Sequence, residues 1–216
     1  AAAAEAANAA ANASSELTTE LTTRPKILCL HGGGGTTSEF RSGLDHIMQA
    51  APQFEFVFAQ GPYPGGLWVP DPPGGKSSPT TSPTIDAQSY TLLDRLVEES
   101  GPFAGILGYS QGAMYVSAYL AHAPPNTFQF AVMFCGYLPT THLGMLSRIN
   151  AAAPFALPAY IFMGVNDQTI TNGMTQQSVT KYVNPTVVVS SAAAHNPPAS
   201  NDPTFGQLTA WMASRA

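Results

Sequence analysis

The sequence predicts an α/β protein built on a mainly parallel sheet of about six strands, with helices on both faces. Short apolar runs, typical of strands buried on both sides, alternate with segments whose apolar residues recur at helical spacing. Such alternation indicates parallel strands joined by crossover helices. A G-x-S-x-G motif, residues 108–112, joins one of these runs to a helical segment. The chain of 216 residues is long enough for one domain with a large core.

We expect strands at residues 26–30, 54–59, 103–107, 128–135, 158–164 and 186–190. Helices are expected at residues 37–50, 86–100, 113–120, 171–183 and 202–214, with a helical or irregular piece at 141–153. Residues 1–23 are polar or alanine-rich, and we interpret them as an N-terminal extension that precedes a single domain, residues 24–216.

Residues 61–84 interrupt the alternation of strands and helices. The segment is dense in Pro and Gly and carries Trp68 near its middle. A long loop in a compact domain is more often functional or mobile than inert. We interpret it as a flexible flap over the functional site, and a surface insertion without a role is the alternative.

Composition excludes several classes of function. The formal charge is −5 and no cluster of Lys and Arg is present, which argues against nucleic acid. No apolar run reaches the roughly 18–20 residues that span a bilayer, and the start lacks the features of a signal peptide. Cys29 and Cys135 lie in apolar runs and are expected to be buried free thiols. We expect a cytoplasmic protein without a bound metal.

Ser110 is the expected nucleophile, because strand, sharp turn and helix are the context of a nucleophile elbow. A serine hydroxyl needs a base, and the base needs an acidic partner. In the α/β-hydrolase fold these partners follow in the order Ser, acid, His. Asp167 is the one acidic residue between Ser110 and the C-terminal histidine, and His195 is the one histidine after Asp167. The alternatives are a turn residue for Asp167 and an exposed loop histidine for His195.

An oxyanion hole is expected beside Ser110, because the tetrahedral intermediate carries a negative charge on the former carbonyl oxygen. One donor is the backbone N–H of Gln111. The second comes from the glycine run after the first strand, with Gly33 as first choice and Gly34 as second. This run lacks the Lys-Ser or Lys-Thr pair of a phosphate loop and the spacing of a dinucleotide fingerprint.

The remaining histidines have structural interpretations. His31 ends the first strand beside the glycines and is expected to shape that loop. His46 and His122 fall in helices or at their ends, and His142 falls in a connecting segment.

Several stretches together resemble the fungal FSH-type family of serine hydrolases, which are small α/β-hydrolases. They include the run from Ile27 to Gly34 followed by Phe40-Arg41, the run Phe54 to Phe58, and the stretch Gly101 to Ala113. Met163 to Asp167 and His195-Asn196-Pro197-Pro198 complete the resemblance, which covers about residues 24–215. Two positions depart from the family: Ala193-Ala194 stands where glycines are usual, and Gln60-Gly61-Pro62 replaces a frequent Asp-Ala-Pro type sequence.

The resemblance implies esterase or thioesterase activity without a cofactor. Some relatives are free-standing thioesterases that release polyketide chains from carrier domains, so the expected substrate is a small acyl ester or thioester, presented in the latter case by an acyl-carrier domain. Aromatic and apolar residues of the flap and loops are consistent with an acyl chain, although each could equally serve packing: Phe40, Tyr63, Trp68, Tyr137 and Leu138. The alternatives are a biosynthetic lyase, isomerase or cyclase using the same site, and a non-catalytic binding protein.

Overall fold

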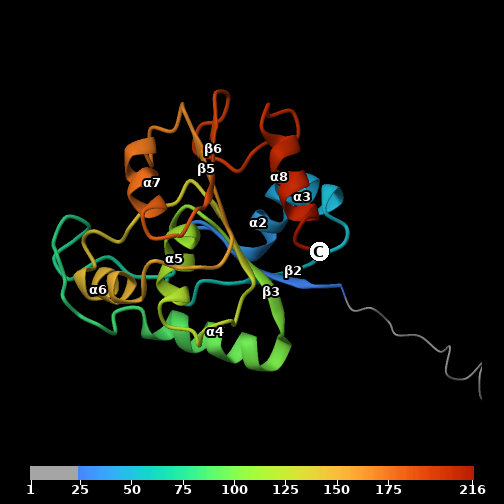
Figure 1. Ribbon diagram of the computed structural model, residues 1–216. Coiled ribbons are helices and arrows are strands. Elements are labelled where there is room, and N and C mark those ends of the chain that lie inside the picture. The colour runs from blue at the N-terminus through green and yellow to red at the C-terminus, as the bar shows by residue number, and fades with distance from the viewer. Residues whose placement is uncertain (1–23) are drawn as a thin grey trace, which may run out of the picture.

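The computed structural model describes residues 24–216, and the predicted N-terminal extension, residues 1–23, lies outside the described residues (Figure 1). The strands are β1 (Lys26–Leu30), β2 (Glu55–Ala59), β3 (Phe103–Tyr109), β4 (Phe130–Phe134), β5 (Ala159–Gly164) and β6 (Thr186–Ser190). The helices are α2 (Thr37–Gly43), α3 (Asp45–Ala50), α4 (Ala87–Ser100), α5 (Gln111–Leu120), α6 (Leu143–Ala152), α7 (Asn172–Val179) and α8 (Phe205–Ala213).

The six strands form one parallel sheet in the order β2-β1-β3-β4-β5-β6. The predicted α/β class and parallel sheet are confirmed. Because parallel strands all end at the same edge, the loops after β1, β3, β5 and β6 meet at the carboxyl edge of the sheet. These loops hold the glycine run, Ser110, Asp167 and His195.

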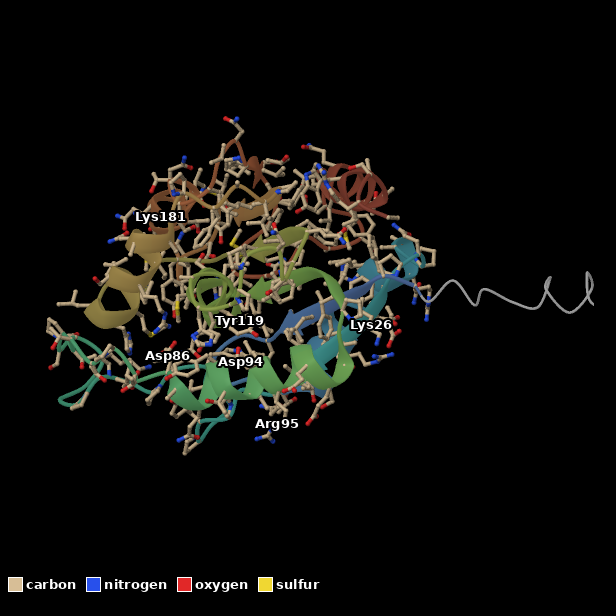
Figure 2. The ribbon with its side chains drawn as sticks, turned by 60° about the horizontal axis from the view of Figure 1, so that its bottom comes forward. Lys26, Asp86, Asp94, Arg95, Tyr119 and Lys181 are labelled. Atoms are coloured by element: carbon tan, nitrogen blue, oxygen red, sulfur yellow. The ribbon has the colours of Figure 1, made fainter. Side chains whose placement is uncertain are left out.

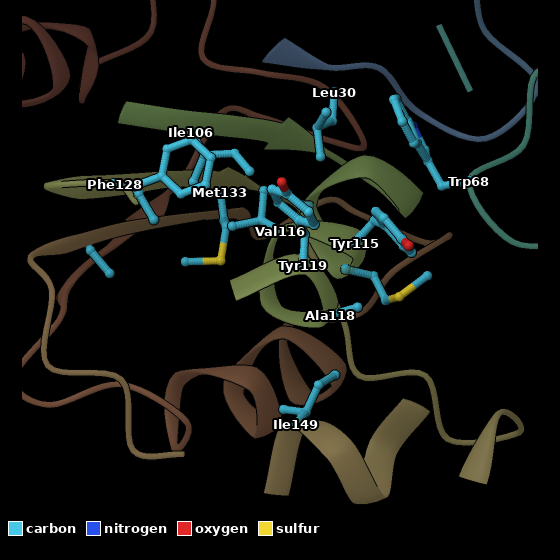
Figure 3. Close-up of a cluster of buried hydrophobic side chains, with 14 of the residues drawn as sticks. Leu30, Trp68, Ile106, Tyr115, Val116, Ala118, Tyr119, Phe128, Met133 and Ile149 are labelled. Atoms are coloured by element: carbon cyan, nitrogen blue, oxygen red, sulfur yellow. The ribbon is translucent and has the colours of Figure 1, made fainter. Parts of the chain in front are cut away.

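Each face of the sheet packs against its own hydrophobic core, as the alternation of side chains along the strands requires. In β1, Leu28 and Leu30 join the core beneath α4, α5 and α6, whereas Ile27 and Cys29 join the core beneath α2, α3 and α8. Figure 3 shows part of the first of these cores, including Leu30. Strands buried on both faces therefore explain the continuous apolar runs of the sequence.

The segment 37–50, predicted as one helix, forms two helices, because the helical conformation is interrupted at Leu44. Thr36 caps α2 by accepting a hydrogen bond from the backbone N–H of Glu39 at 3.3 Å, while its hydroxyl donates to the Glu39 carboxylate at 2.7 Å. Gly43 ends α2, and glycine weakens a helix at this point. The break allows Leu44 to be completely buried in the core. The piece at 141–153 is helical, as α6.

Polar contacts tie the helices to one another at the surface. Tyr119 of α5 donates its hydroxyl to Asp94 of α4 at 3.1 Å, and Asp94 also bonds His122 at 2.9 Å; Asp94 and Tyr119 are labelled in Figure 2.

No helix among residues 24–216 is long and apolar enough to cross a bilayer.

Candidate active site

Ser110 lies at a sharp turn between β3 and α5. Its backbone has a φ of 53°, in the left-handed region that non-glycine residues rarely adopt. A Cβ on Gly108 would lie 2.5 Å from the carbonyl oxygen of Gly112, and one on Gly112 would overlap the carbonyl of Leu30. Only glycine lets the strand and helix cross this closely. The turn thereby presents the Ser110 hydroxyl at the carboxyl edge of the sheet.

The structure brings Ser110, His195 and Asp167 into one hydrogen-bonded chain. Nε2 of His195 lies 2.9 Å from Oγ of Ser110, and its Nδ1 lies 2.7 Å from Oδ2 of Asp167. A carboxylate only accepts, so Nδ1 carries the proton and the Nε2 lone pair faces the serine hydroxyl. Ser110 and His195 are 85 residues apart in the sequence, and Asp167 and His195 are 28 apart, so the fold brings the three side chains together.

Asp167 is held in place by the loop that follows β5. Its Oδ1 accepts the backbone N–H groups of Thr169 at 2.9 Å and Ile170 at 2.8 Å. The second oxygen is thereby directed at His195, and only 1% of the Asp167 side chain is exposed, against 21% for His195. A buried carboxylate with these partners can orient the imidazole and stabilise its protonated form.

The two residues predicted to supply the oxyanion donors, Gln111 and Gly33, lie next to each other in the structure. Gln111 is the first residue of α5, where helix N–H groups have no intrahelical partner. A Cβ on Gly33 would lie 3.2 Å from the Gln111 side chain, so the two residues are adjacent. Gly34, the second choice from sequence, donates its N–H to the carbonyl of Gly66 at 3.0 Å. Its N–H is therefore committed elsewhere, which favours Gly33.

His31 supports the glycine run from inside the domain. Its Nε2 accepts the backbone N–H of Gly61 at 3.0 Å, and its Nδ1 bonds the carbonyl of Gly32 at 2.7 Å. These partners require a neutral ring with the proton on Nδ1. Burial lowers the pKa of His31, against smaller opposing effects of the Gly32 carbonyl and Glu39.

The segment 61–84 packs against the same glycine run. Trp68 has no exposed surface, stacks on Tyr115 at 5.8 Å and donates its indole N–H to the carbonyl of His31 at 2.8 Å; Trp68 and Tyr115 are labelled in Figure 3. The side chain of Gln111 accepts the Trp68 backbone N–H at 2.8 Å and donates to Val69 O at 3.3 Å. Residues 61–69 thus connect the glycine run to the start of α5. The flexibility expected for 61–84 stays a prediction.

A cavity of about 360 Å³ is lined by the glycine run, by α2, by Tyr109, which directly precedes Ser110, and by Pro197, which lies two residues after His195. Phe40, Tyr109 and Pro197 supply its apolar walls, and Glu39 lies at it as well. A larger cavity of about 670 Å³ is lined by residues 123–129 and 154–158, which precede β4 and β5 at the opposite edge of the sheet.

The other residues predicted to bind substrate lie away from the 360 Å³ cavity wall. Tyr63 donates its hydroxyl to the carbonyl of Ile85 at 2.7 Å, and Leu138 is buried in the core with Tyr137 packed against it. Trp68 faces Tyr115 and His31, as described above. Of the five predicted residues, Phe40 is the one that lines this cavity.

Tyr109 and Cys135 contact this site, and sequence reasoning gave neither a role in it. Sγ of Cys135 and the ligand atoms of Asp167 and His195 lie within 4.8 Å of one another, the one such trio of potential metal ligands among residues 24–216. Each of the three has a hydrogen-bond partner in the protein. The trio is therefore tied into the site by hydrogen bonds to its surroundings. The signal that could have found Cys135 is its place directly after β4 at the carboxyl edge.

A family model described as Serine hydrolase (FSH1) matches residues 75–204, which include Ser110, Asp167 and His195. The chain belongs to the FSH1 serine hydrolase family. The resemblance expected from the sequence is confirmed, and this FSH1-family chain is an enzyme of the serine hydrolase class.

Relatives and solved structures agree with this family. Esterase FUS5 of Gibberella fujikuroi is 30% identical over 209 residues, covering 84% of this chain and 83% of that protein. Among solved structures, esterase PE8 superposes with a TM-score of 0.65 at 17% identity, covering 90% of this chain and 94% of that one. Zea mays acyl-protein thioesterase 2 has a TM-score of 0.65 at 16% identity, with 89% and 94% covered. At these identities the structures show the fold, which is that of α/β-hydrolases.

Proposed function

We propose that this FSH1-family protein cleaves an acyl ester or thioester through an acyl-Ser110 intermediate. The observation that carries the proposal is the continuous hydrogen-bonded chain from Ser110 through His195 to Asp167, next to the N–H groups of Gln111 and Gly33. Nucleophile, base, orienting acid and oxyanion donors are the parts that acyl transfer needs. The esterase name of the relative FUS5 supports the same reaction class.

Acylation begins when Oγ of Ser110 attacks the carbonyl carbon of the substrate. His195 takes the serine proton on Nε2, which faces Oγ at 2.9 Å, and Asp167 stabilises the imidazolium that results. The former carbonyl oxygen becomes negative and accepts hydrogen bonds from Gln111 and Gly33. When the C–O or C–S bond breaks, the Nε2 proton passes to the leaving group. Removing one oxyanion donor typically raises the barrier by about 3–4 kcal/mol.

Deacylation repeats these steps with water as the nucleophile. His195 accepts a proton from water as its oxygen attacks the acyl carbon, and then returns that proton to Oγ of Ser110. The products are a carboxylic acid and the free enzyme, so no cofactor enters the proposed cycle.

The 360 Å³ cavity is proposed to take the apolar part of the substrate. Its apolar walls from Phe40, Tyr109 and Pro197 stand beside the backbone of the glycine run and next to the Ser110 turn. Apolar walls with few polar groups favour an uncharged chain or ring over a charged group. Trp68, Tyr63, Tyr137 and Leu138 act in this proposal by shaping the domain rather than by touching substrate.

A thioester on an acyl-carrier domain is the finer form of the proposal. The resemblance to fungal FSH-type hydrolases implies a polyketide or fatty-acyl chain of secondary metabolism as the acyl group, and the fungal relative FUS5 is an esterase. Both cysteines are free and buried, which fits a reducing compartment such as the cytoplasm.

The proposal is tested with a panel of p-nitrophenyl esters and acyl thioesters of graded chain length. The wild-type protein is expected to hydrolyse members of the panel, and Ser110→Ala to lose this activity completely while remaining folded by circular dichroism. Ser147→Ala, at an exposed position of α6, serves as the matched control and should keep full activity. Full activity in Ser110→Ala would overturn the proposal.

A further inference from the structure

His195 lies in a loop, residues 191–198, that has no helix or strand of its own. Two backbone hydrogen bonds involve this loop near His195, from Asn166 N–H to Ala193 O and from Asn196 N–H to Ala194 O, both at 3.0 Å. A base on such a loop must be held by contacts from outside it if its distance to Ser110 is to stay fixed.

Tyr109 makes the first such contact. Its hydroxyl donates to the main-chain carbonyl of His195 itself at 2.7 Å, and its ring lies 5.2 Å from the imidazole. Burial raises the pKa of this hydroxyl to about 12, with smaller effects of Cys135 and Asp167, so the proton that it donates is retained at neutral pH. Tyr109 ends β3 and directly precedes Ser110. It therefore joins the main chain of the base to the strand that carries the nucleophile.

Cys135 makes the second contact, from the end of β4. Its Sγ lies 3.5 Å from the carbonyl of Asn196 and 3.9 Å from that of Ala194, the residues on either side of His195. Burial and the nearby charge of Asp167 raise the pKa of the thiol to about 12, which keeps it a donor. The backbone φ of Cys135 is 52°, a left-handed conformation that a side chain adopts only where its surroundings impose it.

We propose that Tyr109 and Cys135 are positioning residues for His195, holding the carbonyls of residues 194, 195 and 196 so that Nε2 stays within reach of Ser110. The inference rests on the proposed function, in which His195 is the base. Proton transfer in the transition state depends steeply on this distance, because small misplacements of a catalytic group cost up to about a hundredfold in rate. Neither residue touches the reacting atoms in this proposal.

Tyr109→Phe tests the first contact, because it deletes the hydroxyl and keeps the ring. We expect kcat to fall by about tenfold while KM changes less than about twofold, since the variant keeps the aromatic ring that lines the 360 Å³ cavity. The rate of fluorophosphonate labelling of Ser110 should fall by the same factor, because labelling also needs the base. Tyr182→Phe is the matched control: it deletes a buried hydroxyl bonded to Ser117 at 2.8 Å, outside the site, and should leave kcat unchanged.

Cys135→Ala and Cys135→Ser test the second contact. The alanine variant loses the donor and should lower kcat by about threefold to tenfold at constant KM. The serine variant restores an O–H donor on a shorter side chain, so the loop has to move slightly toward it, and it should recover part of that loss. If alanine and serine reduce kcat equally, or if neither reduces it, the thiol is not holding the loop and its half of the proposal is overturned.

His195→Ala, measured in the same series, separates this inference from the proposed function. An inactive His195→Ala together with a fully active Tyr109→Phe would overturn the positioning role and leave the base assignment intact. A fully active His195→Ala would overturn the proposed function itself. The inference would also be overturned if the kcat of Tyr109→Phe, corrected for the fraction of the protein that is folded, equalled the wild-type value. Tyr109 would then serve stability alone.

Discussion

At the scale of single residues, the site depends on side chains whose protonation state is set by burial and by partners. His31 is the clearest case, because its two hydrogen bonds require one neutral tautomer. Nδ1–H donates to the Gly32 carbonyl, and the lone pair on Nε2 accepts the Gly61 N–H. Protonation of Nε2 would break the second bond and loosen the glycine run from residues 61–69.

Stability is expected to depend on the pH through His31. Its pKa in the folded protein is lowered by burial, so the unfolded chain binds a proton at a higher pH than the folded one. The free energy of unfolding should therefore be fully retained above about pH 6.5, the ordinary histidine value, and decline as the pH falls through the lower folded pKa. Urea unfolding of the wild type and of His31→Asn, repeated at a series of pH values below and above about 6.5, measures the free energy of unfolding. An equal decline toward low pH in both proteins would contradict the prediction.

Phe40 is the residue expected to set preference for the acyl group. Phe40→Ala removes an apolar wall of the 360 Å³ cavity, so we expect kcat/KM for long-chain esters to fall by about tenfold to a hundredfold relative to acetyl esters. The ratio of long-chain to acetyl activity is the measurement, because Phe40 also packs on Phe58 and Tyr109 and its loss lowers stability. Equal losses on both substrates would show that Phe40 serves packing only.

At the scale of elements, the close approach of β3 and α5 fixes the position of Ser110, which lies between them. Gly108 faces the backbone of Gly112, and Gly112 faces the carbonyls of Leu30 and His31 at the end of β1. β1, β3 and α5 therefore approach one another at two positions, Gly108 and Gly112, where a Cβ would not fit.

Gly112→Ala is expected to force the start of α5 away from β1. The added methyl would overlap backbone atoms, which cannot move as a flexible side chain can. We expect the free energy of unfolding to fall by about 1–3 kcal/mol or more, the range typical of overpacking in a core. Gly206→Ala, in α8 where a Cβ would meet nothing within 4 Å, is the control and should not be destabilised. Wild-type stability in Gly112→Ala would contradict the described crossing.

The segment 61–69 acts at the same scale as a support for the oxyanion loop. Trp68→Phe removes the indole N–H that holds the His31 carbonyl and retains an aromatic ring against Tyr115. We expect kcat/KM to fall by about tenfold on acetyl and long-chain esters alike, because the change acts on the loop and not on the acyl chain. Trp211→Phe, on α8, is the control. A loss confined to long chains would instead support the flap interpretation of the sequence.

At the scale of the whole molecule, most of the fold follows from sequence because the four central strands, β1, β3, β4 and β5, are buried on both faces and appear as continuous apolar runs. Residues 26–30 and 186–190 match β1 and β6 without error, since each apolar run is bounded by polar or turn residues. Ser110, Asp167 and His195 were found from their order in the chain, which reflects the order of strand ends. The structure brings these three together, and their catalytic roles remain the proposal made above.

Other features depend on contacts that no local pattern encodes. The hydrogen bond from Tyr109 to His195 joins residues 86 positions apart, and Cys135 meets Asn196 across 61 positions. Trp68 is apolar, and an apolar residue suits a substrate pocket as well as a core, so its burial could not be predicted. The break at Leu44 follows from tertiary packing, which overrides the helical spacing of residues 37–50.

The central claim, an acyl-enzyme on Ser110, is tested most directly by trapping that intermediate. An active ester of an acyl group that deacylates slowly is mixed with the protein, quenched in acid within milliseconds and digested for mass spectrometry. We predict the mass of one acyl group on the peptide that contains Ser110, formed together with a burst of leaving group equal to the enzyme concentration. The acyl mass should be absent in Ser110→Ala. Turnover without any acylated peptide, or an acyl group on a residue other than Ser110, would contradict the account.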